Sequence, residues 1–200
     1  MKKITISILL ALILSIITRG VTGAVEVETT TSKLIRLHVV ANSNSEEDQA
    51  EKLVIRDAVL TYVSELTCEC QSKSEAVDLI TSHLDEITEV AQSITDLTVL
   101  VSYETVLVDE RVYDDFTLPA GYYDALCVMI GKAQGKNWWC VLYPSLCVSG
   151  AITIDDCETL DDGDLLIIKE PEKVKYKLFC YELWQKVKRM FSDRKSLVGT

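Results

Sequence analysis

The alternation of apolar and polar side chains predicts strands in four parts of the chain. In residues 33–41, apolar side chains occupy every second position, and Arg36 and His38 fall on the polar face of a half-buried strand. Runs rich in β-branched and aromatic residues follow at 97–108, 122–130 and 138–143. The last strand ends at Pro144, because proline cannot donate a hydrogen bond to a neighbouring strand.

Two helices are predicted between the first and second strands. Each begins at a serine that can cap it, Ser45 with Asp48 and Ser72 with Glu75. Asp48 and Lys52 are expected to form an exposed ion pair one turn apart. In the second helix, apolar positions recur at spacings of three and four without interruption. The element order predicts an α+β fold: a mainly antiparallel sheet of about four strands with two helices on one face.

The composition changes beyond Gly150. Residues 33–148 carry the predicted sheet and its helices and form one domain. Residues 150–170 are acidic and interrupted, which is typical of a linker. Residues 171–195 predict a basic amphipathic C-terminal helix with several aromatic side chains. Such a helix can lie on an anionic membrane, dock in a groove of a partner, or cap the core of its own protein.

The N-terminus has the pattern of a secretory leader. Lys2 and Lys3 precede Ile4–Ile17, an uncharged apolar run shorter than the roughly 20 residues of a typical spanning helix. We expect residues 1–24 to be a signal peptide, with cleavage after Ala24. The alternative is an uncleaved membrane anchor. In either case the chain is expected to be exported.

The charge and cysteine content limit the partners and the redox state. A formal net charge of -11 argues against nucleic-acid binding, which requires a basic surface. In an oxidising compartment some of the seven cysteines should pair. We predict a disulfide between Cys140 and Cys147, since Tyr143 and Pro144 between them indicate a turn. The pairing of the others is left open: Cys68, Cys70, Cys127, Cys157 and Cys180.

The motifs of common enzymes are missing from the sequence. The loop Gly131–Asn137 has the glycines and lysine of a phosphate loop, but a strand rather than a helix follows it, which favours a hairpin. A cysteine hydrolase would need a thiolate beside an imidazole, and Cys140 with His38 is the candidate pair. No metal-ligand or cofactor motif is present. We therefore predict no catalytic residues, metal or cofactor.

Some polar and aromatic residues are not required by ordinary folding and are candidate contacts with a partner. Trp138 and Trp139 are adjacent on a strand, so their rings should point to opposite faces of the sheet. Tryptophan is enriched among the residues that dominate binding energy. The predicted partner-binding residues are His38, Asn42, Ser43, Gln49, Lys136, Asn137, Trp138 and Trp139.

Several of these residues belong to segments in which the chain resembles the stage II sporulation protein R family of endospore-forming bacteria. The matching segments are Ile35–Ser43, Glu47–Gln49 with Lys52, Arg56 and Asp57, Leu118–Tyr122, Gly135–Pro144, and Leu146 with Cys147.

The resemblance implies export from the forespore into the space between its membrane and that of the mother cell. There the protein would trigger a membrane-embedded aspartic protease that processes the sigma-E precursor. It would act as a signal and not as an enzyme. An exported cysteine-dependent hydrolase is the alternative.

Overall fold

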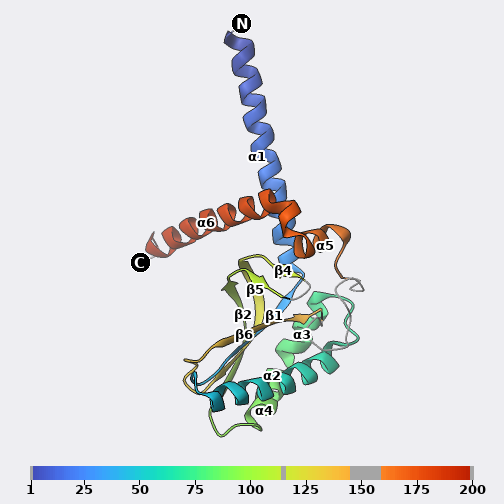
Figure 1. Cartoon of the computed structure of the whole chain (residues 1–200), viewed down its shortest axis with the longest axis vertical. Helices are drawn as coiled ribbons and strands as arrows, with labels where there is room; N and C mark the ends of the chain where they lie inside the picture. The colour runs from blue at the N-terminus through green and yellow to red at the C-terminus, as the bar shows by residue number, and fades with distance from the viewer. Residues whose placement is uncertain (1, 114–115, 145–158, 199–200) are drawn as a thin grey trace. The chain divides into compact units, whose positions relative to one another are not determined.

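The computed structural model describes residues 2–113, 116–144 and 159–198 (Figure 1). The chain divides into two compact units, each with its own core. We call residues 32–107 with 122–159 the sheet unit, and residues 1–31, 108–121 and 160–200 the helical unit.

The sheet unit is built on four strands in the spatial order β2 (Val99–Val108), β5 (Gly121–Ile130), β1 (Ile35–Val40) and β6 (Asn137–Tyr143). The α+β class predicted from the sequence is confirmed. The sheet is mixed, because β1 pairs in parallel with β5 and antiparallel with β6. The long connection between β1 and β5 contains helices, which allows the parallel pairing.

Three helices complete the sheet unit: α2 (Glu46–Thr67), α3 (Lys73–Ser82) and α4 (Leu84–Gln92). They pack on one face of the sheet (Figure 1), and strand and helix side chains form one hydrophobic core there. The two predicted caps are confirmed, since Ser45 Oγ accepts from Asp48 N at 3.2 Å and Ser72 Oγ accepts from Glu75 N at 3.3 Å.

The second predicted helix, which begins at Ser72 and was expected to be continuous, is broken at His83. The backbone of His83 leaves the helical region, with φ −114° and ψ 24°. Ser82 Oγ donates to Asp78 O at 2.8 Å, and the ring nitrogen Nδ1 of His83 lies 2.9 Å from Leu79 O. The ring of His83 shares Leu79 O with the backbone N–H of the same residue, which lies 3.2 Å from that oxygen, at the point where the helix breaks.

Strand β1 is more deeply buried than the half-buried strand that the sequence predicts. It lies between two neighbours, and Arg36 on the face away from the helices is fully buried. The guanidinium carbon of Arg36 lies 5.1 Å from the ring centre of Tyr123 and 5.7 Å from that of Trp139, and Nε donates to Cys140 O at 3.1 Å. Aromatic faces and a carbonyl stabilise a charge that would otherwise be costly to bury.

The helical unit contains α1 (Lys2–Ser32), the strands β3 (Arg111–Val112) and β4 (Thr117–Leu118), α5 (Asp162–Lys169), the short 3₁₀ helix η2 (Pro171–Val174), and α6 (Lys175–Val198). Residues 150–170 were expected to form a linker, but 162–169 are helical. Asp161 and Asp164 form a capping box that starts α5. The core cluster of the unit consists of Ala24, Val27, Ile167, Val174 and Tyr181.

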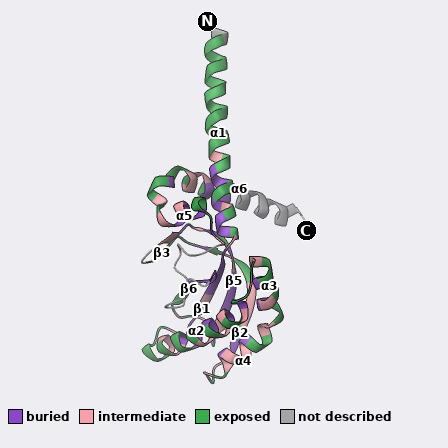
Figure 2. Cartoon of the chain, turned by 90° about the vertical axis from the view of Figure 1, so that its right-hand side faces the viewer, coloured by how far each residue is buried: buried purple, intermediate pink, exposed green. Residues whose placement is uncertain are grey.

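Helix α1 has two parts of different burial. Its N-terminal half is exposed, and buried positions begin at Gly23 (Figure 2). Within the described residues, α1 is the one helix long and apolar enough to cross a membrane. The expected cleavage point after Ala24 falls inside this continuous helix.

Candidate functional site

Most of the predicted contact residues gather where β1 ends, next to the start of α2 and the loop 131–136. We call the hydrogen-bonded part of this region the clamp: Asn42, Ser43, Asp48, Gln49 and Lys52. Asn42 Nδ2 donates to Asp48 Oδ2 at 2.9 Å, and Asn42 Oδ1 accepts from Lys132 N at 3.0 Å. The clamp therefore ties the turn after β1 both to α2 and to the loop.

Backbone hydrogen bonds also connect the turn after β1 to the loop 131–136. Gly135 N donates to Ala41 O at 2.8 Å, and Gln134 N donates to Asn42 O at 3.2 Å. A Cβ atom on Gly135 would lie 2.2 Å from Ser43 O, so only glycine fits there without displacement of the backbone. Gly135 in the loop Gly131–Asn137 thus allows the close approach of the two backbone segments.

Lys52 lies at the centre of the clamp and is buried. Its ammonium donates to Gln49 Oε1 at 2.7 Å and to Lys136 O at 3.1 Å. Burial lowers the pKa of Lys52, with the charges of Arg56 and Lys136 acting in the same direction. The exposed pair of Lys52 with Asp48 is therefore a wrong prediction: Lys52 holds the backbone of Lys136 and directs that residue to the surface.

Asp48 has its pKa lowered by hydrogen bonds from Ser43 and then from Asn42. Gln49 Nε2 also donates to Ser43 O at 2.8 Å. The polar atoms of Asn42, Ser43 and Gln49 are thus used within the fold. This arrangement gives three of the predicted contact residues a structural role.

Beside the clamp lies what we call the Trp138 patch: Arg56, Lys136, Asn137 and Trp138. Lys136 and Asn137 are exposed, and the Trp138 side chain is 38% exposed. The guanidinium of Arg56, on α2, lies 4.3 Å from the Trp138 ring centre. The Arg56 side chain is 17% exposed and forms an ion pair with Asp57 at 2.7 Å, so the patch offers an apolar ring with one exposed cation, Lys136.

Trp139 points to the opposite face, as the sequence predicts. Its ring stacks on His38 with centroids 3.8 Å apart and an interplanar angle of 5°. His38 Nε2 lies 3.2 Å from Asn137 Oδ1, an oxygen that can only accept, so Nε2 donates. His38 and Trp139 are paired across β1 and β6, on the sheet face away from the helices.

The candidate pair of Cys140 and His38 is not formed. Cys140 lies opposite Leu37 on the helix-covered face and belongs to the core, whereas His38 lies on the other face. His38 Nδ1 instead lies 3.9 Å from Cys127 Sγ. Burial raises the pKa of Cys127 to about 12, so this thiol stays protonated near neutral pH and is a poor nucleophile.

Other predictions on cysteines and metals fall partly outside the structure. Cys147 lies outside the described residues, so the disulfide from Cys140 stays a prediction. Cys68, Cys70, Cys127 and Cys180 carry free thiols. Across the described ranges, no group of three or more His, Cys, Asp or Glu side chains could hold a metal ion.

Sequence reasoning missed Arg56 and Lys52 as parts of the site. Asp48, Lys52 and Arg56 recur every four residues from the start of α2, so they share the helix face that meets the loop. This spacing was the available signal, but it also fits a solvated helix face. Only the position of loop 131–136 against α2 distinguishes a functional helix face from a solvated one.

The fold and the site define an α+β protein in which polar residues connect the turn after β1 to α2 and to the loop 131–136, with a partly exposed tryptophan beside them. Comparison with known proteins identifies the chain as a member of the stage II sporulation protein R family, whose model matches residues 31–153. The protein therefore belongs to the sporulation machinery. It is 36% identical to stage II sporulation protein R of Bacillus subtilis (strain 168) over 118 residues, 56% of this chain and 53% of the relative.

The chain thus spans about half the length of the curated relative that it matches. No solved structure matches it. The matched segment covers the sheet unit, including the clamp and the Trp138 patch, and leaves most of the helical unit outside.

Proposed function

We propose that the protein is an exported intercompartmental signal that activates a membrane-embedded aspartic protease to process the sigma-E precursor. Membership of the stage II sporulation protein R family supports this proposal. The observation that carries it is the Trp138 patch, where an exposed tryptophan stacked on the Arg56 guanidinium lies beside the exposed Lys136. The site of action is the space between the forespore and mother-cell membranes.

The mechanism is preferential binding to the active state of the protease. A ligand shifts a conformational equilibrium only by the difference between its affinities for the two states. Moving a protease from about 1% to about 99% active requires roughly 10⁴-fold preference for the active state. The Trp138 patch supplies a ring and the exposed Lys136 ammonium for this discrimination, and an acidic group on the protease would complement that cation.

Co-expression tests the proposal directly. The sigma-E precursor and its membrane protease are produced together, with and without this chain, and precursor cleavage is followed by immunoblot. We expect cleavage only when the chain is present. Equal cleavage in its absence would exclude the activating role.

The patch predicts the effect of a single substitution. Trp138→Ala should lower precursor processing by about tenfold or more, because a tryptophan at the centre of an interface contributes about 2 kcal/mol or more. Leu100→Ala is the control, since Leu100 is 64% exposed on β2, the edge strand opposite β6. Equal losses in the two variants, or none in Trp138→Ala, would remove the patch from the proposal.

A membrane-surface contact through residues 171–195 is a further part of the proposed function. On α6, apolar side chains lie exposed at helical spacing: Tyr176, Phe179, Leu183 and Trp184. Several lysines in this region are in ion pairs, Lys173 with Glu170 and Lys175 with Glu172. Contact would therefore depend more on apolar insertion than on charge.

A further inference from the structure

Helix α1 continues without a break through the expected leader cleavage point and enters the core of the helical unit. Ala24 and Val27 are buried in one cluster with Ile167, Val174 and Tyr181. Residues on both sides of the expected cut are therefore part of a packed structure. Peptidases act on locally unfolded backbone, and here the backbone stays helical through the expected cut, although Val25 directly after it is 52% exposed.

Two glycines of α1 fit closely against α6. A Cβ atom on Gly20 would lie 3.1 Å from Cys180 Sγ, and one on Gly23 would lie 3.0 Å from Lys177 Cγ. Small residues at such positions let two helices approach closely. Both glycines would be lost if residues 1–24 were removed, so cleavage would destroy part of this interface.

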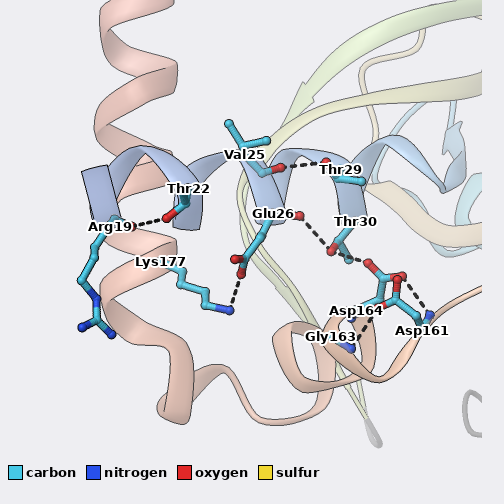
Figure 3. Close-up of polar contacts among 10 residues, drawn as sticks. All are labelled: Arg19, Thr22, Val25, Glu26, Thr29, Thr30, Asp161, Gly163, Asp164 and Lys177. Atoms are coloured by element: carbon cyan, nitrogen blue, oxygen red, sulfur yellow. Dashed lines mark hydrogen bonds and ion pairs between the residues drawn. The ribbon is translucent and has the colours of Figure 1, made fainter. Parts of the chain in front are cut away.

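Polar contacts also hold α1 against α5 and α6 on the C-terminal side of the expected cleavage point (Figure 3). Thr30 is buried, and its hydroxyl donates to Asp164 Oδ1 at 2.6 Å. Asp164, itself 4% exposed, also accepts from Asp161 N at 2.9 Å, so α5 is oriented toward α1. Lys177 on α6 forms an ion pair with Glu26.

After a cut at Ala24, the remaining part of α1 would end at Ser32 and span about two turns. Helices this short are marginal in water unless tertiary packing holds them. The interface with α5 and α6 is therefore most stable when α1 is intact. This gives the uncut chain a thermodynamic advantage that a disposable leader would not have.

The exposed half of α1 has the properties of a membrane anchor. The uncharged run from Ile4 to Thr18 is about 22 Å long as a helix, and Arg19 at its end can extend its charge toward water. The helix then continues through Val21 and Val25. Lys2 and Lys3 favour a cytoplasmic N-terminus, which puts the chain that follows the anchor on the outer side of the membrane.

We propose that the leader is retained, and that docking of α5 and α6 on residues 20–31 protects it and holds the protein at the membrane by α1. The bound surface is the lipid bilayer, occupied by the exposed half of the helix. A tethered signal meets a membrane-embedded partner in two dimensions, which raises its effective concentration. The inference needs only export and does not depend on protease activation.

The test uses the full chain with a C-terminal epitope tag, expressed in a spore-forming host. Membranes are washed with alkaline carbonate, and the intact mass of the tagged protein is measured. We expect the full mass of residues 1–200 in the membrane pellet. A wild-type protein lacking the leader and released into the supernatant would overturn the inference. This experiment does not measure precursor processing, so a negative result would contradict leader retention without contradicting the proposed function.

Variants on α5 test the protective docking without changing the leader sequence. Asp164→Ala should raise the released, shortened fraction about tenfold, because it removes the charged acceptor of the Thr30 hydroxyl. Asp162→Ala is the matched control, since Asp162 is an exposed acid in the same helical turn. Thr30→Val removes the same hydrogen bond from the other side and should reproduce the release. If these variants and the control are retained equally, docking does not protect the leader.

Discussion

At the residue scale, Asn42 and Asn44 stand in the same turn but have different roles. Asn42 bonds to the backbone of Lys132 and to the Asp48 carboxylate. Asn44 is exposed, and no side-chain hydrogen bond from it occurs among the described residues. Asn42→Ala should lower the free energy of unfolding by about 1 kcal/mol, since it removes the acceptor of the Lys132 amide and one of the hydrogen bonds to the Asp48 carboxylate. Urea denaturation of the purified protein measures this change.

The Asn44→Ala variant is the control and should stay within about 0.5 kcal/mol of the wild type. A pH series gives an independent check. Hydrogen bonds from Ser43 and Asn42 lower the pKa of Asp48 in the folded protein. Their stabilisation is therefore present above the unfolded pKa and lost as the pH falls through the lowered folded value. The difference between wild type and Asn42→Ala should shrink in acid, and a constant difference would contradict the role of Asp48.

Sequence could identify the residues of this site better than their roles. The opposite directions of Trp138 and Trp139 follow from the strand period and are confirmed by their contacts with Arg56 and His38. The pairing of His38 with Cys127 instead of Cys140 depends on register across β5 and β6. Register between distant strands is set by tertiary packing, so local pattern could not reveal it.

At the element scale, the joint between the β1–α2 turn and loop 131–136 depends on two loop positions with opposite requirements. Gly135 lies against Ser43 O, where a Cβ atom would clash at 2.2 Å. Ala133 has φ of 50°, a conformation that favours glycine. Gly135→Ala should therefore cost about 1–3 kcal/mol. Ala133→Gly should be neutral or slightly stabilising, because relief of the backbone offsets the added freedom of the unfolded chain.

Thermal and urea unfolding of the two variants tests this contrast. Both substitutions exchange glycine and alanine in one loop, so they differ mainly in which backbone they meet. Equal destabilisation by both would mean that the loop tolerates no change at all. No loss in Gly135→Ala would mean that the loop can move away from Ser43 without cost.

The elements themselves were predictable where short-range chemistry decides them. Ser45 and Ser72 cap α2 and α3 as their spacing indicates. The break at His83 was not predicted, because apolar spacing continues through it and only the local hydrogen bonds of Ser82 and His83 mark its position. The parallel neighbour of β1 was also missed, since it lies far along the chain.

At the scale of the whole molecule, sequence did not reveal the second core. The apolar run of α1 hides the few positions, such as Ala24 and Val27, that pack instead of facing lipid. The acids near Asp164 fit a linker by composition, although Asp164 is buried. The core of the helical unit combines residues that are far apart in the sequence, so no continuous stretch of the chain shows its apolar pattern.

The two separate cores predict independent stability. Tyr181→Ala removes a ring that is 1% exposed in the helical unit, and Leu126→Ala removes a fully buried side chain in the sheet unit. Each should cost about 2–5 kcal/mol within its own unit. Hydrogen exchange followed by mass spectrometry should then show faster exchange of α6 amides in Tyr181→Ala, with β1 and β5 unchanged. Leu126→Ala should give the reverse pattern.

This pair of variants distinguishes two modes of unfolding. If the units unfold separately, each variant lowers protection in one of them only, as for cooperative regions of unequal stability. If both variants loosen both units to the same extent, the molecule is one cooperative body despite its two clusters. Independence would let the helical unit open while the sheet unit keeps its clamp and Trp138 patch formed. The Trp138 patch could then still bind its partner even when the packing of α1 against α6 is lost.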